Sequence, residues 1–329
     1  MSTNYQNLFS PFKLGNVPLS TRVVMAPMTR SRAIDNLPND SIVTYYRDRA
    51  SDALIITEGT APSPNGLGYP RIPGLFNQAQ ATAWKKVTDA VHEKNGKIFI
   101  QLMHTGRVSH PLNLPTGAKV IAPSAIAASA TEMYTDAKGM QPLPVPEMMD
   151  KAQIKNTIQE YVDSAKLAMT AGFDGVELHG ANGYLIDQFL NPASNTRDDN
   201  YGGTFENRNR FAIEVATAVA QAIGKDKVGI RISPFGVFNE MISDDNTEAQ
   251  FVALAKAFKE IGLVYVHIVD HAAMGAPALP ANIKDAIKIA FGGTIILSGG
   301  YDAPRAEADR KSTRLNSSHS TLSRMPSSA

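Results

Sequence analysis

The sequence predicts an α/β fold of the (β/α)8 TIM-barrel class, and three observations carry that prediction. Short β-branched runs alternate with longer segments of helical periodicity, which indicates parallel strands joined by crossover helices. The sequence lacks the glycine-rich dinucleotide fingerprint of a doubly wound sheet. Polar side chains also recur on the strand face that would point into a barrel. The pattern contains seven such strands, and an eighth is missing.

Composition excludes several classes of protein. The chain has 329 residues, of which 43% are hydrophobic and 19% charged, as in a globular protein with a large core. Its net charge of +1 favours neither nucleic acid nor an anionic membrane. The chain has no cysteine, so redox chemistry would need a cofactor. Without a signal peptide or an apolar run of about 18 residues, we expect a soluble, cytoplasmic protein.

The elements follow one another in regular order. Helical periodicity with capping residues and terminal glycines predicts four helices, at 77–96, 150–172, 204–224 and 246–262. The predicted strands are 22–26, 53–57, 97–102, 173–179, 228–232, 264–269 and 294–298.

Two segments depart from this alternation. Residues 104–149 are proline-rich and too long for a plain crossover, so we expect a flap over the barrel mouth. Residues 310–329 are rich in serine and lack apolar periodicity. We therefore expect one incomplete barrel domain over 1–309, followed by a disordered, non-native tail that supplies no eighth strand.

Side-chain alternation places three polar residues inside the predicted barrel. In three of the strands, apolar residues alternate with polar ones, and the apolar set belongs under the helices. Gln101, His179 and Arg231 therefore point inward near the carboxyl ends of their strands, where barrel enzymes keep their active sites.

Each of these three residues also has a structural interpretation. His179 could be a hydrogen-bonded core histidine, and Gln101 could be a buried amide that serves the backbone. An unpaired buried guanidinium is unfavourable, so Arg231 could simply pair with Glu177 or Glu58.

The turns after the strands add further candidates. The segment after 173–179 brings Asn182 and Tyr184 close to His179, which supplies two donors and a phenol, although Tyr184 could instead pack on the next helix. Gly299 and Gly300 suit close approach of a phosphate, or a tight turn.

Other chemistries lack support. His104, His267 and His271 do not have the spacing of a metal site, and we predict none. The chain contains neither a P-loop nor a GxSxG motif. Donors, a buried cation and a tyrosine without a nucleophile suit a bound redox cofactor better than hydrolysis.

With these residues assembled, the chain resembles the old yellow enzyme family of FMN-dependent ene-reductases, of the N-ethylmaleimide reductase and pentaerythritol tetranitrate reductase type. The resemblance covers about residues 8–309. Its motifs are LFSPFKLG (8–15), VVMAPMTR (23–30), ITEGT (56–60), QLMHTGR (101–107), GVELHGANGYLIDQFL (175–190), RDDNYGG (197–203), GIRISP (229–234) and SGGYDAPRAEA (298–308).

The resemblance implies a bound FMN, NADPH or NADH as reductant, and reduction of enones or nitro compounds by a ping-pong mechanism. His179 and Asn182 would hold the substrate oxygen, Tyr184 would protonate the α-carbon, and Tyr69 would line the substrate pocket. The residues implied in cofactor binding are Pro27, Met28, Thr29, Gly59, Gln101 and Arg231 at the ring, and Gly299 and Gly300 at the phosphate.

Two departures from the family pattern leave alternatives open. Met103 stands where several relatives carry tryptophan, which affects the expected substrate range. The family continues into an eighth strand with a Gly-Arg pair, whereas the resemblance ends here near Arg310. The alternatives are a non-catalytic fragment that binds FMN weakly and, more remotely, a cofactor-free lyase or isomerase. The oligomeric state, the preferred nicotinamide and the physiological substrate are not predicted.

Overall fold

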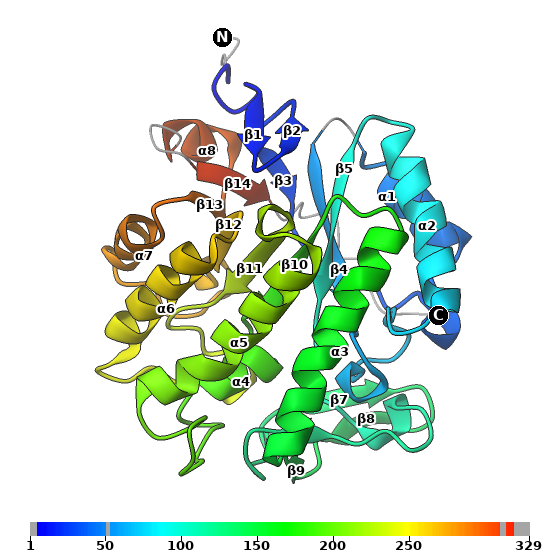
Figure 1. Ribbon diagram of the computed structural model, residues 1–329, viewed down its shortest axis with the longest axis vertical. Coiled ribbons are helices and arrows are strands. Elements are labelled where there is room, and N and C mark those ends of the chain that lie inside the picture. Colours follow the sequence, from blue (N-terminus) through cyan, green and yellow to red (C-terminus); the bar gives the residue numbers. More distant parts are fainter. Residues whose placement is uncertain (1–4, 51–52, 310–313, 319–329) are drawn as a thin grey trace.

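The computed structural model describes residues 5–50, 53–309 and 314–318, and its centre is a closed barrel of eight parallel strands (Figure 1). Neighbouring strands follow the chain order around the barrel, with the last strand hydrogen-bonded to the first. The barrel strands are β3 (Val23–Met25), β4 (Leu54–Thr60), β5 (Lys97–Leu102), β10 (Gly175–Gly180), β11 (Val228–Ile232), β12 (Tyr265–Val269), β13 (Thr294–Ser298) and β14 (Arg314–Ser318).

The seven predicted strands are confirmed, but the prediction that no eighth strand follows is wrong. Arg314–Ser318 forms β14, which pairs in parallel with β13 and with β3. Without it, the backbone groups along two strand edges would lack partners, and closure outweighs the weak local pattern of this segment. The expected disorder of the remaining tail concerns residues 310–313 and 319–329, which lie outside the described residues.

Helices surround the barrel, and capping side chains begin several of them (Figure 1). The Asn77 side chain accepts from Gln80 N–H, and Asp150 forms a reciprocal capping box with Gln153. The predicted helices at 77–96, 150–172, 204–224 and 246–262 are thereby confirmed as α2, α3, α5 and α6. The helices are α1 (Asp40–Arg47), α2 (Gln78–His92), α3 (Lys151–Thr170), α4 (Leu185–Leu190), α5 (Phe205–Ile223), α6 (Thr247–Ile261), α7 (Ile283–Phe291) and α8 (Ala303–Asp309).

Apolar side chains fill the space between barrel and helices and close one barrel end. The larger core cluster joins outward residues of the strands, such as Val176 and Ile230, to helix residues such as Trp84. A hairpin of β1 (Phe12–Leu14) and β2 (Val17–Leu19) adds Leu14 and Leu19 to a second cluster with Phe99 and Tyr265. The hairpin therefore covers the end where the strands begin.

Residues 104–149 lie at the opposite end of the barrel. They contain the short strands β6 (Ile121–Ala122), β7 (Glu132–Thr135), β8 (Gly139–Pro142) and β9 (Glu147–Met148), of which β7 and β8 form an antiparallel hairpin (Figure 1). Val108 and Met133 of this flap pack in one apolar cluster with Met103 and Tyr184. The flap therefore adjoins the carboxyl ends of the strands. Within the described ranges, no helix is long and apolar enough to cross a membrane.

Candidate active site

A cavity of about 410 Å³ opens at the carboxyl ends of the barrel strands. Its volume lies within the range of about 300–1,000 Å³ that is usual for small-molecule sites. The lining residues are Pro27, Met28, Thr29, Gly59, Gln101, Met103, His179, Asn182, Tyr184, Arg231, Phe238, Val269, Asp270, His271, Ala273, Met274, Ser298, Gly299 and Gly300.

All but one of the site residues expected from the sequence line this single cavity. The exception is Tyr69, which lies in the adjoining apolar cluster and contacts the cavity through Tyr184. The hydroxyl oxygens of Tyr69 and Tyr184 are 2.9 Å apart. The fold thus brings together lining residues from seven of the eight barrel strands or from the turns that follow them.

A strained turn after β10 presents Asn182 to the cavity. Asn182 and Gly183 have φ angles of 61° and 72°, so two consecutive residues occupy the left-handed region. Asn182 N–H donates to the Ser233 hydroxyl at 2.9 Å, and Asn239 Nδ2 donates to the Asn182 carbonyl at 2.7 Å. The Asn182 side-chain oxygen is buried without a hydrogen-bond partner among the described residues. The backbone is held while the amide remains available.

The Asp187 carboxylate stabilises the same turn by two hydrogen bonds. It accepts from Gly183 N–H at 2.8 Å and from the Ser233 hydroxyl at 3.1 Å. Burial raises the pKa of Asp187 to about 7, although both hydrogen bonds favour the charged form. Asp187 and Ser233 therefore connect the turn after β10 to the end of β11.

His179 is neutral and aims a donor at the cavity. Burial lowers the pKa of His179 well below its usual range, and the Arg231 charge lowers it further. Its Nδ1 accepts from Ala181 N–H at 3.3 Å, so the ring proton belongs on Nε2. The His179 ring lines the cavity.

Tyr184 carries its proton at neutral pH. Burial raises the pKa of Tyr184 well above its usual range, and the neighbouring Tyr69 raises it further. The Tyr184 ring also contacts the His179 ring edge-on, with centroids 4.9 Å apart. A protonated phenol thus lies beside the imidazole donor.

Arg231 is a buried cation that lines the cavity and interacts with the charge of Glu177. Its Nε has no hydrogen-bond partner in the part of the chain that the structure describes. Glu58, one of the expected partners, instead accepts from Arg30 N–H at 3.1 Å and Tyr46 hydroxyl at 3.3 Å. Burial lowers the pKa of Arg231, and the charge of Glu177 opposes that effect. The Arg231 Nε–H is therefore available to an acceptor in the cavity.

Two glycines at the end of β13 bring the backbone to the cavity wall. Gly299 and Gly300 have φ angles of 118° and 63°, and a Cβ at Gly299 would clash with the Asp270 carbonyl. Both the turn and the exposed backbone thus require glycine here.

Sequence reasoning missed several lining residues. Phe238 and His271 form part of the rim, where their rings lie 4.3 Å apart. They come from loops after β11 and β12, for which no periodic signal exists. Within the described ranges, no group of three or more His, Cys, Asp or Glu could hold a metal ion.

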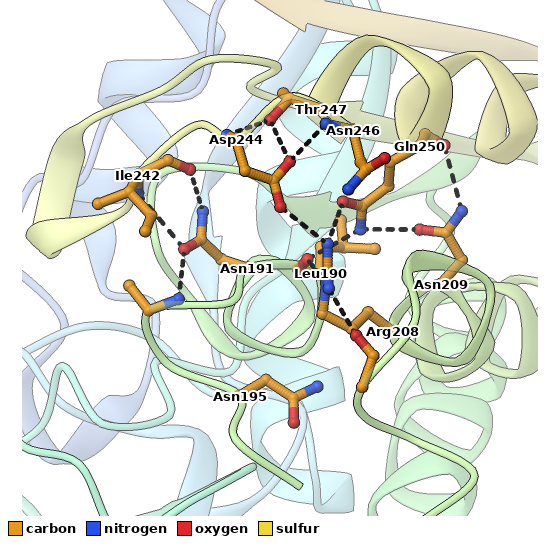
Figure 2. A network of polar contacts seen from close by, with 12 residues as sticks. Leu190, Asn191, Asn195, Arg208, Asn209, Ile242, Asp244, Asn246, Thr247 and Gln250 are labelled. Atoms are coloured by element: carbon orange, nitrogen blue, oxygen red, sulfur yellow. Dashed lines mark hydrogen bonds and ion pairs between the residues drawn. The ribbon is translucent and has the colours of Figure 1, made fainter. Parts of the chain in front are cut away.

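A polar network behind the site fixes the loop between β11 and α6 (Figure 2). Arg208 Nε and Gln250 Nε2 both donate to the Leu190 carbonyl, at 2.9 and 2.8 Å. Asn191 exchanges two hydrogen bonds with the backbone of Ile242. The loop that contains the rim residue Phe238 is therefore hydrogen-bonded to Asn191, which follows the Asn182 turn in the chain.

Known proteins share both the sequence and this architecture. The model of the "NADH:flavin oxidoreductase / NADH oxidase family" matches residues 7–314. Chanoclavine-I aldehyde reductase of Penicillium roqueforti is 43% identical, covering 91% of this chain and 80% of that protein. A probable flavin mononucleotide-dependent alkene reductase of Leishmania infantum is 46% identical, covering 72% of this chain and 66% of that protein.

Solved structures agree with these sequence matches. Morphinone reductase superposes with a TM-score of 0.90 at 39% identity, covering 96% of this chain and 87% of its own. Its complex with tetrahydroNAD gives a TM-score of 0.88 at 40% identity, covering 94% of this chain and 86% of its own. Motifs, fold and cavity lead to one conclusion: the chain belongs to the NADH:flavin oxidoreductase / NADH oxidase family, the old yellow enzymes.

Proposed function

We propose that this chain, an FMN-dependent oxidoreductase that uses NAD(P)H, reduces the C=C bond of small enones at the described cavity, with His179, Asn182 and Tyr184 as its catalytic residues. The observation that carries the proposal is the convergence of two side-chain donors and a protonated phenol in one cavity. Relatives named for alkene and morphinone reduction support this substrate class.

The cavity residues fit FMN. The Arg231 guanidinium is a buried cation whose Nε has no hydrogen-bond partner among the described residues. It can compensate negative charge on the flavin ring. Gln101 offers an amide for the polar edge of the ring, and the pair Gly299 and Gly300 offers a wall without side chains for the phosphate. The ring would also contact Pro27, Met28, Thr29 and Gly59.

Substrate activation would come from two donors. FMN, held by the cavity residues, would supply the transfer of a hydride from NAD(P)H to the β-carbon of the enone. His179 Nε2–H and the Asn182 amide would hold the substrate carbonyl oxygen, on which negative charge develops. The His179 ring and the Asn182 backbone are held by hydrogen bonds before the substrate arrives, which limits the reorganisation needed to stabilise that charge.

Tyr184 would complete the reduction by donating its phenolic proton to the α-carbon. Its raised pKa keeps the phenol protonated at the pH of the reaction. Tyr69 lies 2.9 Å away and can return a proton to Tyr184 after each turnover. Nitro compounds would use the same two donors and would not require this proton transfer.

The open barrel expected of a non-catalytic fragment is not what the structure contains, because β14 closes the barrel. Flavin colour distinguishes the remaining alternatives. A yellow protein that bleaches with NADPH or NADH and recovers its colour with cyclohexenone supports the proposal. A folded, colourless protein would instead favour a non-catalytic chain that binds FMN weakly or, more remotely, a cofactor-free lyase or isomerase.

Single substitutions test the donor assignment. His179→Ala and Asn182→Ala should each slow cyclohexenone reduction about 10²-fold or more, since each removes one donor from the developing oxyanion. FMN should remain bound. Matched controls are His92→Ala and Asn16→Ala, whose side chains bind Asp174 and Asp226 away from the cavity. Unchanged turnover in both active-site variants would refute the assignment.

A further inference from the structure

A polar cluster lies inside the barrel, one layer below the cavity. Its centre is Glu177 on β10, which is fully buried and precedes His179 by two residues on the same strand face. Glu177 accepts from Gln101 Nε2 at 2.7 Å, the Tyr265 hydroxyl at 3.0 Å and His267 Nδ1 at 2.9 Å. All three donors lie on the neighbouring strand β5 or on β12.

The cluster is connected to the cavity at several points. Gln101 and Ser298 belong to the cluster and also line the cavity. Gln101 is hydrogen-bonded to Glu177, and Ser298 is hydrogen-bonded to His267 Nε2. Arg231 on β11 is paired in register with His179 and with His267. Gln101 and Arg231 thus connect Glu177 to the cavity that they line.

Glu177 is the anion of this cluster, and His267 donates to it. Burial raises the pKa of Glu177, but His267, Arg231 and Gln101 together outweigh burial, and the net shift is downward. Burial lowers the pKa of His267, and its Nδ1–H donates to the carboxylate. Glu177 therefore places a negative charge in the barrel interior, where it interacts with the positive charge of Arg231.

The charge of Glu177 determines how Gln101 faces the cavity. An ionised carboxylate can only accept hydrogen bonds, so the Gln101 amide must turn its NH2 group toward Glu177. The amide oxygen is then the end available to the cavity. Gln101 consequently presents an acceptor rather than a donor to the flavin ring.

We propose that Glu177 is a positioning residue that sets the balance between the oxidised and reduced forms of bound FMN, an inference that rests on the cofactor assigned above. It acts through Gln101, whose amide oxygen it turns toward the cavity, and through Arg231, whose positive charge it partly compensates. Because reduced FMN carries more negative charge, the net charge beneath the ring decides how strongly the reduced form is favoured.

The test is the midpoint potential of FMN bound to the whole protein. E177Q removes one negative charge and leaves Arg231 less compensated. We expect the affinity for reduced FMN to rise about tenfold relative to oxidised FMN, which for a two-electron couple makes the potential about 30 mV more positive. An unchanged or more negative potential would overturn the proposal.

F99L is the matched control. Phe99 is fully buried in the barrel and packs on Tyr265, with ring centroids 6.0 Å apart, but it bears no charge. F99L should lower the melting temperature and leave the potential at the wild-type value. A shift in F99L equal to that in E177Q would show that packing, not charge, moves the potential.

Y265F keeps the proposal testable if E177Q does not fold. This variant retains the carboxylate but removes one donor that spreads its charge, so the potential should become more negative, opposite to E177Q. No change, or a positive shift, overturns the proposal. Failure of the wild type to bind FMN overturns the proposed function as well, whereas equal potentials in an active wild type and E177Q overturn only this inference.

Discussion

Replacing Asp187 by asparagine should change how the stability of the protein depends on pH. Burial raises the pKa of Asp187 from 3.8 to about 7, so the folded state holds this proton more strongly than the unfolded state. Stability from this group is therefore complete below the unfolded pKa and is lost as pH rises through about 7. A difference of about three units at 1.36 kcal/mol each amounts to about 4 kcal/mol.

The asparagine variant lacks this titration, so its unfolding free energy relative to wild type should increase by about 4 kcal/mol between pH 4 and pH 8. The assay is urea denaturation at saturating FMN over that range. Glu58, whose pKa burial also raises to about 7, is present in both proteins and cancels in the difference. Ser233→Ala keeps the carboxyl but removes a hydrogen bond that favours its charged form, so its stability should depend on pH at least as steeply as that of wild type. Parallel curves for wild type and D187N would refute the reasoning.

Three further predictions concern the cavity and its surroundings. Tyr184→Phe should leave flavin reduction by NADPH at the normal rate and slow the reoxidation of flavin by enones. Tyr69→Phe should slow reoxidation by a smaller factor. Stopped-flow absorbance measures the two half-reactions separately. Met103→Trp should fill part of the cavity and raise KM for bulky enones more than for cyclohexenone, measured by steady-state kinetics. Arg107→Met should lower stability by about 1–3 kcal/mol in denaturant titrations, because the buried Arg107 side chain donates to the carbonyls of Ile126 in the flap and Asn239 in the rim loop.

Strand periodicity explains why much of the site was predictable from sequence. Alternation with period two assigns a direction to every side chain of a barrel strand, so the pattern of residues alone places Gln101, His179 and Arg231 inside the barrel. Applied to β12, the same rule would also have found Tyr265 and His267, because they alternate with Val266 and Ile268, which pack outward. The Glu177 cluster could therefore have been predicted from the sequence.

Contacts between loops were not predictable in this way. Asp187 and Ser233 are 46 residues apart in the sequence and form a hydrogen bond. This contact depends on two turns, and no periodic pattern predicts the path of either turn. The strand β14 was missed for a related reason. Five residues without apolar alternation contain little local signal, and their pairing follows from the open edges of β13 and β3.

Closure by β14 also has a consequence for synthesis on the ribosome. Val23 of β3 pairs with Asn316 of β14, and these positions are 293 residues apart. The barrel therefore cannot close until the ribosome has translated β14 and released it. Until then the nascent chain exposes two unpaired strand edges, which are sites of association between growing chains. Neighbouring nascent chains on one messenger RNA must therefore be kept apart until this strand emerges.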